Sequence, residues 1–306
     1  MKNLHALIGN YLEFCQNQKR LDNKTLKAYR IDLRQFEEQT EENDPKNITS
    51  ETLEKFIAGL HQIYNPKTVK RKIASLKALF HYFEYKDIIE VNPFHKVQVR
   101  FREPVILPKT IPLHTVEVFL ATMYREMELA GTPIQKRNVL RDIAVIELLF
   151  ATGMRISELC ALTPEDVNLY EGTILIYGKG AKERKIQIGN EDVVKVLAEY
   201  RNEFREEIRA WDCFFINHCG KSLSDQAVRR MINKYTDLAA IEMHITPHMF
   251  RHTFATSLLE ADVDIRYIQE MLGHSSINIT EIYTHVTLRK QGDILREKHP
   301  RKGFCI

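Results

Sequence analysis

Apolar residues recur at helical spacing through most of this 306-residue chain, and that periodicity is the feature that most constrains its fold. Near the start of the chain we predict a first helix and then three more, beginning close to Asn23, Thr49 and Asn65. A helix with one apolar face buries that face against a partner, so residues 1–98 are expected to form a helical domain. The predicted inward positions are Leu4, Leu7, Ile8, Tyr11, Leu12, Phe14, Leu26, Tyr29, Leu33, Phe36, Leu53, Phe56, Ile57, Leu60, Val69, Ile73, Leu76, Leu79, Phe80 and Phe83.

The periodicity stops at Asn92–Pro93, and residues 97–112 then contain three prolines and no helical pattern. We therefore place a linker at 99–112 and a second domain at 113–306. In that domain two β-rich runs flank Gly178–Lys179–Gly180 and predict a hairpin, so the expected fold is mainly α with a small β-sheet, an α+β chain of two domains. The strands are expected at 172–177 and 184–188, and the helices at 114–128, 138–151, 156–162, 190–209, 223–239, 247–260, 264–272, 277–283 and 287–297.

Composition excludes several classes of protein. With 44% hydrophobic and 28% charged residues, the chain can bury a sizeable core, yet it has no apolar run near the ~18 residues of a membrane-spanning helix. The first residues read as an amphipathic helix rather than a signal peptide. The five cysteines are scattered and form no CxxC motif, which favours a reducing cytosol over a disulfide framework or a zinc ribbon.

The net charge of +3 becomes informative only when it is divided along the chain. Residues 1–110 hold 19 Lys and Arg against 14 Asp and Glu, a balance of +5, whereas the rest holds 25 against 27, a balance of −2. The predicted fourth helix carries several basic residues away from its apolar stripe. Such a helix suits contact with DNA phosphates, although a plain solvated face explains it equally well. The candidate DNA-binding residues are Lys67, Lys70, Arg71, Lys72 and Lys77.

Two polar motifs stand inside apolar surroundings in the second domain. An apolar helix is expected to end at Gly153, and Arg155 and Glu158 then share one face of the next helix. An ordinary ion pair on the protein surface would show the same spacing. Lys179 stands in the hairpin turn between two glycines, which leave its amine room to approach a ligand. An ordinary basic turn would look the same.

Two further motifs follow towards the C-terminus. Thr246–Pro247 begins a helix in which His248 and Arg251 share a face near the N-terminus, a position that favours anions such as phosphate. A capped surface helix is the alternative. Downstream, His274 lies in a Leu-Gly-His-Ser segment and Tyr283 precedes Thr-His, and either residue alone is usually structural.

The histidines near residue 248 also raise the possibility of a metal site. His244, His248 and His252 repeat every four residues, and paired histidines on a helix can bind zinc. Because Pro247 starts the helix after His244, only the last two are secure neighbours, and no glutamate stands between them. We therefore expect no metal and no other cofactor.

In this order, the Arg-x-x-Glu, Gly-Lys-Gly, His-x-x-Arg-His, Leu-Gly-His-Ser and Tyr-Thr-His motifs closely resemble the tyrosine recombinase (phage integrase) family. The likeness reaches nearly the whole chain, and its C-terminal end, His299–Pro300–Arg301, looks like Xer-type members. The resemblance implies a site-specific DNA recombinase built as a C-shaped clamp, with a helical SAM-like core-binding domain and a catalytic domain. It also implies a bacterial cytoplasmic enzyme associated with the nucleoid.

Roles are carried over residue by residue. The resemblance implies that Arg155 and Arg251 bind the scissile phosphate, that Tyr283 is the nucleophile, and that Glu158 supports this shell. It also makes Lys179 the hairpin lysine and His248 and His274 the two site histidines. The implied product is a 3′-phosphotyrosine with a free 5′-hydroxyl at short inverted-repeat sites, formed without ATP or metal.

The partners follow from the same resemblance. They are double-stranded DNA and three further copies of the chain, in a tetramer on two DNA sites that exchanges the segment 287–306 between protomers; a second recombinase or an accessory protein is also compatible. Two alternatives stay open at this point. The chain could be a DNA-relaxing (type IB topoisomerase-like) or hairpin-resolving enzyme with the same covalent chemistry, or an architectural DNA-binding protein that kept the fold.

Overall fold

The structure is a computed structural model that describes residues 3–98, 109–178 and 182–273. The chain divides into two compact units, Met1–Val105 and Ile106–Ile306, which are described separately below. Among the described residues, no helix is both long and apolar enough to cross a membrane. Nor does a disulfide bond join any of the described cysteines.

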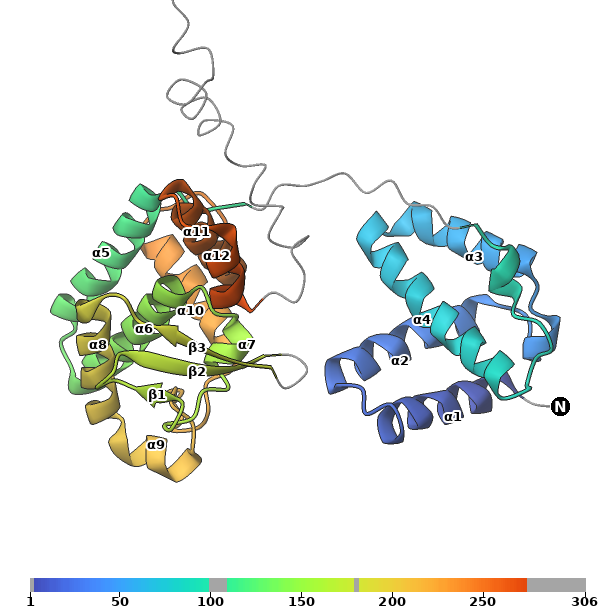
Figure 1. Ribbon diagram of the computed structural model, residues 1–306, viewed down its shortest axis with the longest axis horizontal. Helices are drawn as coiled ribbons and strands as arrows, with labels where there is room; N and C mark the ends of the chain where they lie inside the picture. The colour runs from blue at the N-terminus through green and yellow to red at the C-terminus, as the bar shows by residue number, and fades with distance from the viewer. Residues whose placement is uncertain (1–2, 99–108, 179–181, 274–306) are drawn as a thin grey trace, which may run out of the picture. The chain divides into compact units, whose positions relative to one another are not determined.

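Within residues 3–98 the first unit has four α-helices, in the order predicted (Figure 1). Helix α4 packs against the other three, and its aromatic rings contact rings of α1 and α2. Tyr11, Phe36, Phe80 and Phe83 are fully buried there. The helices are α1 (Leu4–Asn17), α2 (Asn23–Gln39), α3 (Ser50–Ile63) and α4 (Pro66–Tyr85), with short 3₁₀ turns at η1 (Pro45–Asn47) and η2 (Pro93–Lys96).

The five basic residues predicted on the outer face of α4 differ in their exposure to solvent. Lys67, Lys70, Arg71 and Lys77 are exposed, whereas Lys72 is only 4% exposed. The prediction that Lys72 lies on the basic outer face is therefore wrong. Its position follows from helical spacing, since it stands three residues after the buried Val69 and four before the buried Leu76.

An internal ion pair explains how a lysine is tolerated in that core. Lys72 Nζ donates to Asp32 Oδ1 at 3.0 Å and to Gln35 Oε1 at 2.6 Å, and the side chain of Asp32 is fully buried. Arg71 and Ser75 also donate to Asp32. A buried charge is stable only when it is paired and hydrogen-bonded, and Asp32 provides both conditions for Lys72.

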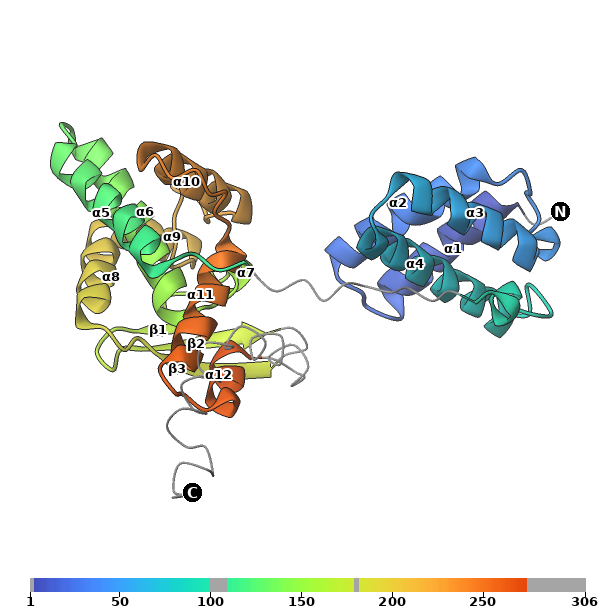
Figure 2. The ribbon, with the colours of Figure 1, turned by 90° about the horizontal axis from the view of Figure 1, so that it is seen from above.

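The second unit is built around α6 (Pro133–Thr152), which has buried residues on most of its faces and contacts α5 (Leu113–Leu129), α8 (Glu191–Glu203) and α11 (Pro247–Glu260). Figure 2 shows α6 between α5 and α11. Such a nearly all-round apolar helix is typical of the interior of a domain. The position of the C-terminal end of α6 is therefore fixed by packing against these helices.

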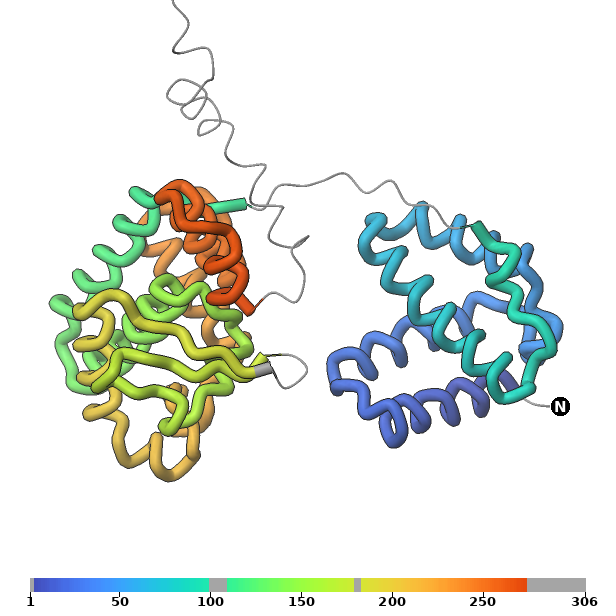
Figure 3. Tube along the Cα trace, viewed as in Figure 1, coloured from blue at the N-terminus to red at the C-terminus, as the bar shows by residue number. Residues whose placement is uncertain are grey.

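The predicted hairpin is present as β2 (Thr173–Gly178) and β3 (Lys182–Gln187), which run antiparallel and side by side (Figure 3). A short strand that was not predicted, β1 (Val167–Asn168), pairs with β2 and completes a three-stranded antiparallel sheet among the described residues. With only two residues, β1 is too short to give a periodic signal. The mainly helical α+β class is confirmed.

Three of the predicted helix boundaries differ clearly from the structure. Helix α6 begins at Pro133 rather than at 138, because Thr132 and Gln135 form a capping box at its start. Residues 190–209 form two helices, α8 and α9 (Arg205–Trp211), because the backbone leaves the helical region at Phe204, whose side chain is buried. The helix predicted at 156–162 is the single turn α7 (Ile156–Leu159). The remaining described helices are α10 (Asp225–Leu238), α11 and α12 (Ile265–Leu272); the helices predicted at 277–283 and 287–297 lie outside the described residues.

Candidate active site

The site begins where α6 ends, at Gly153. This residue has φ +59° and adopts the left-handed conformation that helix C-caps favour. A Cβ atom at Gly153 would lie 2.5 Å from Cδ1 of Phe254, so only glycine fits against α11 there. The chain consequently turns at once into α7 and presents Arg155 and Glu158, as the sequence predicted.

Arg155 and Glu158 form an ion pair, but not a surface one. Nη1 of Arg155 lies 2.7 Å from Oε1 of Glu158, and the backbone N–H of Arg155 donates to Oε2 at 2.9 Å. The side chain of Glu158 is 6% exposed, whereas that of Arg155 is 36% exposed. The carboxylate is thus an internal support, and the guanidinium that it holds still reaches the surface.

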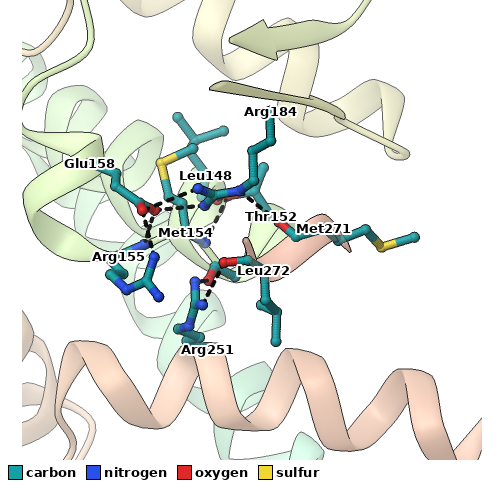
Figure 4. Close-up of polar contacts among 10 residues, drawn as sticks. Leu148, Thr152, Met154, Arg155, Glu158, Arg184, Arg251, Met271 and Leu272 are labelled. Carbon is teal, nitrogen blue, oxygen red and sulfur yellow. Dashed lines mark hydrogen bonds and ion pairs between the residues drawn. The ribbon is translucent and has the colours of Figure 1, made fainter. Parts of the chain in front are cut away.

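Arg184 of β3 joins this pair and was missed by the sequence analysis. Its Nη2 lies 2.7 Å from Oε2 of Glu158, its Nη1 lies 3.1 Å from Oε1, and its Nε donates to the carbonyl of Met271 at 2.9 Å (Figure 4). A signal for Arg184 was available. It alternates with Ile186 and Ile188, both buried, so strand periodicity places it on the inward face.

The charge state of Glu158 follows from these neighbours. Burial alone raises the pKa of the carboxyl group, but hydrogen bonds and charge from Arg184 and Arg155 outweigh it and hold the pKa below its ordinary value. Glu158 is therefore ionised at neutral pH.

Arg251 approaches the same place from α11. It is buried, its Nη1 donates to the carbonyl of Gly153 at 2.8 Å, and its Nη2 donates to the carbonyl of Leu272 at 2.7 Å. Figure 4 shows Arg155, Glu158, Arg184 and Arg251 gathered between the α6–α7 junction and the end of α12.

The histidines of α11 lie close to Arg251. His248 is exposed in the first turn, next to the N-cap residue Thr246, whose side chain makes no capping bond although its position is the predicted one. His252 is half-buried; burial, together with the charges of His248 and Arg251, lowers its pKa to about 4. A neutral His252 adds no charge beside Arg251 at physiological pH.

Three predicted site residues, Lys179, His274 and Tyr283, lie outside the described residues. The described residues stop next to two of them: β2 ends at Gly178, and α12 ends at Leu272, with Gly273 as its C-cap in the left-handed conformation. Among the described residues, no group of three His, Cys, Asp or Glu side chains could hold a metal ion. The site that the structure describes is a cluster of arginines around one carboxylate.

Two family models match the chain. The phage integrase family model matches residues 121–290, more than half of the chain, and the model of the phage integrase N-terminal SAM-like domain matches residues 8–86. The chain belongs to the phage integrase family. This family comprises the tyrosine recombinases, so the chain is a site-specific DNA recombinase, as the motif order indicated.

Relatives of similar length support the assignment. A tyrosine recombinase of Agathobacter rectalis is 65% identical over 304 residues, covering 99% of each chain. The tyrosine recombinase XerD of Listeria monocytogenes is 36% identical over 307 residues, covering 97% of this chain and all of that one. These relatives give no support to the DNA-relaxing and architectural alternatives.

Solved structures share the fold of this tyrosine recombinase. The XerH recombinase bound to its difH substrate has a TM-score of 0.73 at 22% identity, covering 96% of both chains. A lambda integrase dimer on a core site, residues 75–356, has a TM-score of 0.70 at 17% identity, covering 99% of both chains. At these identities the comparison establishes the fold alone.

Proposed function

We propose that this recombinase cleaves DNA with Tyr283 while Arg155 and Arg251 bind the scissile phosphate. The observation that carries the proposal is the convergence of these two arginines, from α7 and α11, beside the buried carboxylate of Glu158. Guanidinium groups stay charged at any working pH and offer forked donors that match phosphate oxygens. They stabilise the charge that grows on those oxygens in the transition state.

The proposed reaction is a phosphoryl transfer to a phenol. The oxygen of Tyr283 attacks the phosphorus, the bond from phosphorus to the 5′-oxygen breaks, and Lys179 donates a proton to that oxygen. His248 accepts or returns a proton near Tyr283, and His274 donates a hydrogen bond to the phosphate. The 3′-phosphotyrosine keeps the bond energy, so a 5′-hydroxyl of a second strand can reverse the step without ATP.

The first domain, assigned to residues 1–98, is proposed to bind the DNA backbone and is joined to the catalytic domain, residues 113–306, by the linker at 99–112. Lys67, Lys70, Arg71 and Lys77 are exposed on α4 and would contact phosphates. Lys72 would serve instead to build the helix interface. Backbone contacts of this kind position the protein without reading sequence.

Strand exchange needs several copies of the enzyme. The related XerH recombinase has been solved bound to difH DNA, and a lambda integrase tetramer has been solved bound to a Holliday junction. By analogy we propose that this recombinase binds double-stranded DNA in the cytoplasm and acts as a tetramer on two sites. The segment 287–306, with Leu288, Ile294 and Leu295, would dock in a neighbouring protomer.

A groove in the second unit supports that docking. It has a volume of about 850 Å³ and lies among α5, α6, α8 and α11, with apolar walls that include Leu120, Phe150 and Val196. Glu147, Asp192 and Glu199 also line it, together with Lys195, and this net acidic lining suits a segment that carries Arg289, Lys290 and Arg296 beside its apolar residues. The groove would therefore accept both the apolar and the basic side of the segment.

Covalent trapping on nicked DNA tests the nucleophile. A nick beside the cleavage site lets a short fragment leave, so the protein–DNA adduct accumulates. We expect an adduct from the native chain and none from Tyr283→Phe, while DNA binding by that variant survives. A normal yield of adduct from Tyr283→Phe would rule out the assignment of Tyr283.

A sulfur substitution tests the proton donor. A 5′-thiolate leaves without protonation, so the cleavage defect of Lys179→Ala should largely disappear on a substrate with sulfur at the 5′ bridging position. An equal defect on both substrates would remove Lys179 from this role. A plasmid with two copies of the DNA site, once footprinting has located that site, separates recombination from relaxation. Recombination changes the number of DNA circles or the order of their segments, whereas relaxation changes only supercoiling.

A further inference from the structure

Arg184 occupies a central place among the groups described above. All three nitrogens of its guanidinium donate hydrogen bonds, two to the carboxylate of Glu158 and one to the carbonyl of Met271. One side chain thus joins β3, α7 and the end of α12. We propose that Arg184 is a positioning residue for strand cleavage, an inference that rests on the proposed function.

The first part of this role concerns charge. Glu158 accepts from both Arg155 and Arg184, so the carboxylate is shared between two guanidinium groups. Without Arg184, Glu158 would neutralise Arg155 and weaken its attraction for a phosphate. With it, Arg155, Arg184, Arg251 and Glu158 together carry a formal charge of +2, which favours an anion beside Arg155 and Arg251.

The second part concerns the end of α12. The last carbonyls of a helix lack partners within the helix and carry partial negative charge. Arg184 binds the carbonyl of Met271, and Arg251 binds that of Leu272. Two arginines thus hold neighbouring peptide groups, which fixes the point from which the chain continues to His274.

Gly273 makes this contact possible. A Cβ atom there would lie 2.9 Å from Nη1 and 3.0 Å from Cδ of Arg184, so a larger residue would push the guanidinium away. The backbone of Arg184 belongs to β3, the strand that follows the predicted lysine turn, and pairs there with Ile176 of β2. Arg184 therefore links the two segments that lead to Lys179 and His274.

Exposure separates Arg184 from Arg155, one of the two proposed phosphate-binding arginines. Its side chain is 9% exposed and its donors are directed to protein acceptors, whereas that of Arg155 is 36% exposed. We therefore place Arg184 behind Arg155, where it acts through Glu158 and the α12 carbonyl. In metal sites, removal of a residue that holds a ligand in place commonly lowers activity by roughly tenfold to a hundredfold, and we expect a loss of similar size here.

The test compares Arg184→Gln with Lys185→Gln, a control at the next position of β3 whose side chain is exposed and paired with Glu171. We measure single-turnover formation of the covalent adduct and, separately, the Kd for the intact site. For Arg184→Gln we expect cleavage about tenfold to a hundredfold slower with Kd changed less than about threefold; the control should match the native chain in both. Native cleavage, or an equal loss of cleavage and binding, overturns the proposal.

A second measurement tests whether Arg184 acts through Glu158. Arg184→Gln leaves a buried carboxylate with one fewer partner, so the double variant Glu158→Gln/Arg184→Gln, which removes both charges, guards against loss of fold. If the two residues act as a unit, the double variant should be at most about threefold slower than the slower single variant. Effects that multiply would overturn the coupling.

The failure of this inference is distinguishable from failure of the proposed function. If the native chain forms no adduct on nicked DNA, the proposed function fails. If the native chain forms an adduct, Tyr283→Phe does not, and Arg184→Gln cleaves at the native rate, only the role of Arg184 is lost.

Discussion

Arg251 donates a hydrogen bond to the carbonyl of Gly153 at 2.8 Å, across 98 positions of sequence. This contact ties α11 to the end of α6, two positions before Arg155. The two proposed phosphate-binding arginines are therefore held relative to each other through the backbone of a glycine, and that glycine has room for no side chain.

Gly153→Ala should disturb both stability and cleavage. A left-handed alanine costs roughly 1–2 kcal/mol, and its Cβ would collide with Phe254, so we expect the free energy of unfolding to fall by at least that amount. Urea unfolding measures it. The control is Gly189→Ala, since no atom lies within 4 Å of a Cβ at Gly189; it should change stability by less than about 0.5 kcal/mol. Equal effects of the two substitutions would contradict the close packing at Gly153.

His252 should make the fold less stable in mild acid. Its pKa is about 4 in the folded state, below the ordinary value of 6.5, so the unfolded chain binds more protons between these values. Stability from the neutral ring is present above pH 6.5 and is lost as the pH falls towards 4. His252→Gln should therefore show a smaller drop in Tm between pH 7.5 and pH 5 than the native chain, and a matched His114→Gln, at an exposed position of α5, should not. An identical pH dependence of native chain and His252→Gln would refute this.

Asp32→Ala should destabilise the first domain strongly. It leaves Lys72 buried without its carboxylate, and breaking a buried pair in this way costs about 3–5 kcal/mol. Calorimetry of the full chain should show the domain's transition at a lower temperature. Glu38→Ala removes an exposed pair with Arg34 and should cost less than about 1 kcal/mol. Comparable losses from both changes would mean that the Asp32–Lys72 pair is not a structural element.

Lys67→Gln and Lys70→Gln should each weaken DNA binding with little dependence on DNA sequence. Each removed phosphate contact should lower the slope of log K against log salt by about 1. Titrations at several salt concentrations give the slope. Lys55→Gln, on α3 and paired with Glu51, is the control and should leave it unchanged. Unchanged slopes for the Lys67→Gln and Lys70→Gln variants would show that these residues do not contact DNA phosphates.

Removal of residues 287–306 should reduce synapsis of two sites more than binding to one. The segment is proposed to dock in a neighbouring protomer, so its loss removes contacts between copies and leaves contacts to DNA. Gel shifts separate single-site complexes from paired ones. Equal losses of both would argue that the segment supports the fold of its own chain.

The sequence predicted local structure well wherever one signal was strong. The α4 start at Asn65–Pro66, the end of α6 at Gly153 and the Gly-Lys-Gly hairpin all depend on residues with narrow backbone preferences. It failed where a tertiary contact decided the outcome. Phe204 breaks a helix because its side chain is buried in the core, and Lys72 is buried because Asp32, forty positions away, binds it.

The sequence by itself determined the order of the functional motifs and the residue types that the chemistry needs, and the resemblance of those motifs to the tyrosine recombinases indicated the family, because each motif is a short local stretch of the chain. Only the tertiary structure decided that Glu158 is buried and shared, and that Arg184 and Arg251 hold the end of α12. Hydrogen bonds between α7, β3, α11 and α12 depend on how distant elements pack. Strand periodicity places Arg184 on an inward face, but spacing within one element carries no information about which distant groups it meets there, Glu158 and the carbonyl of Met271.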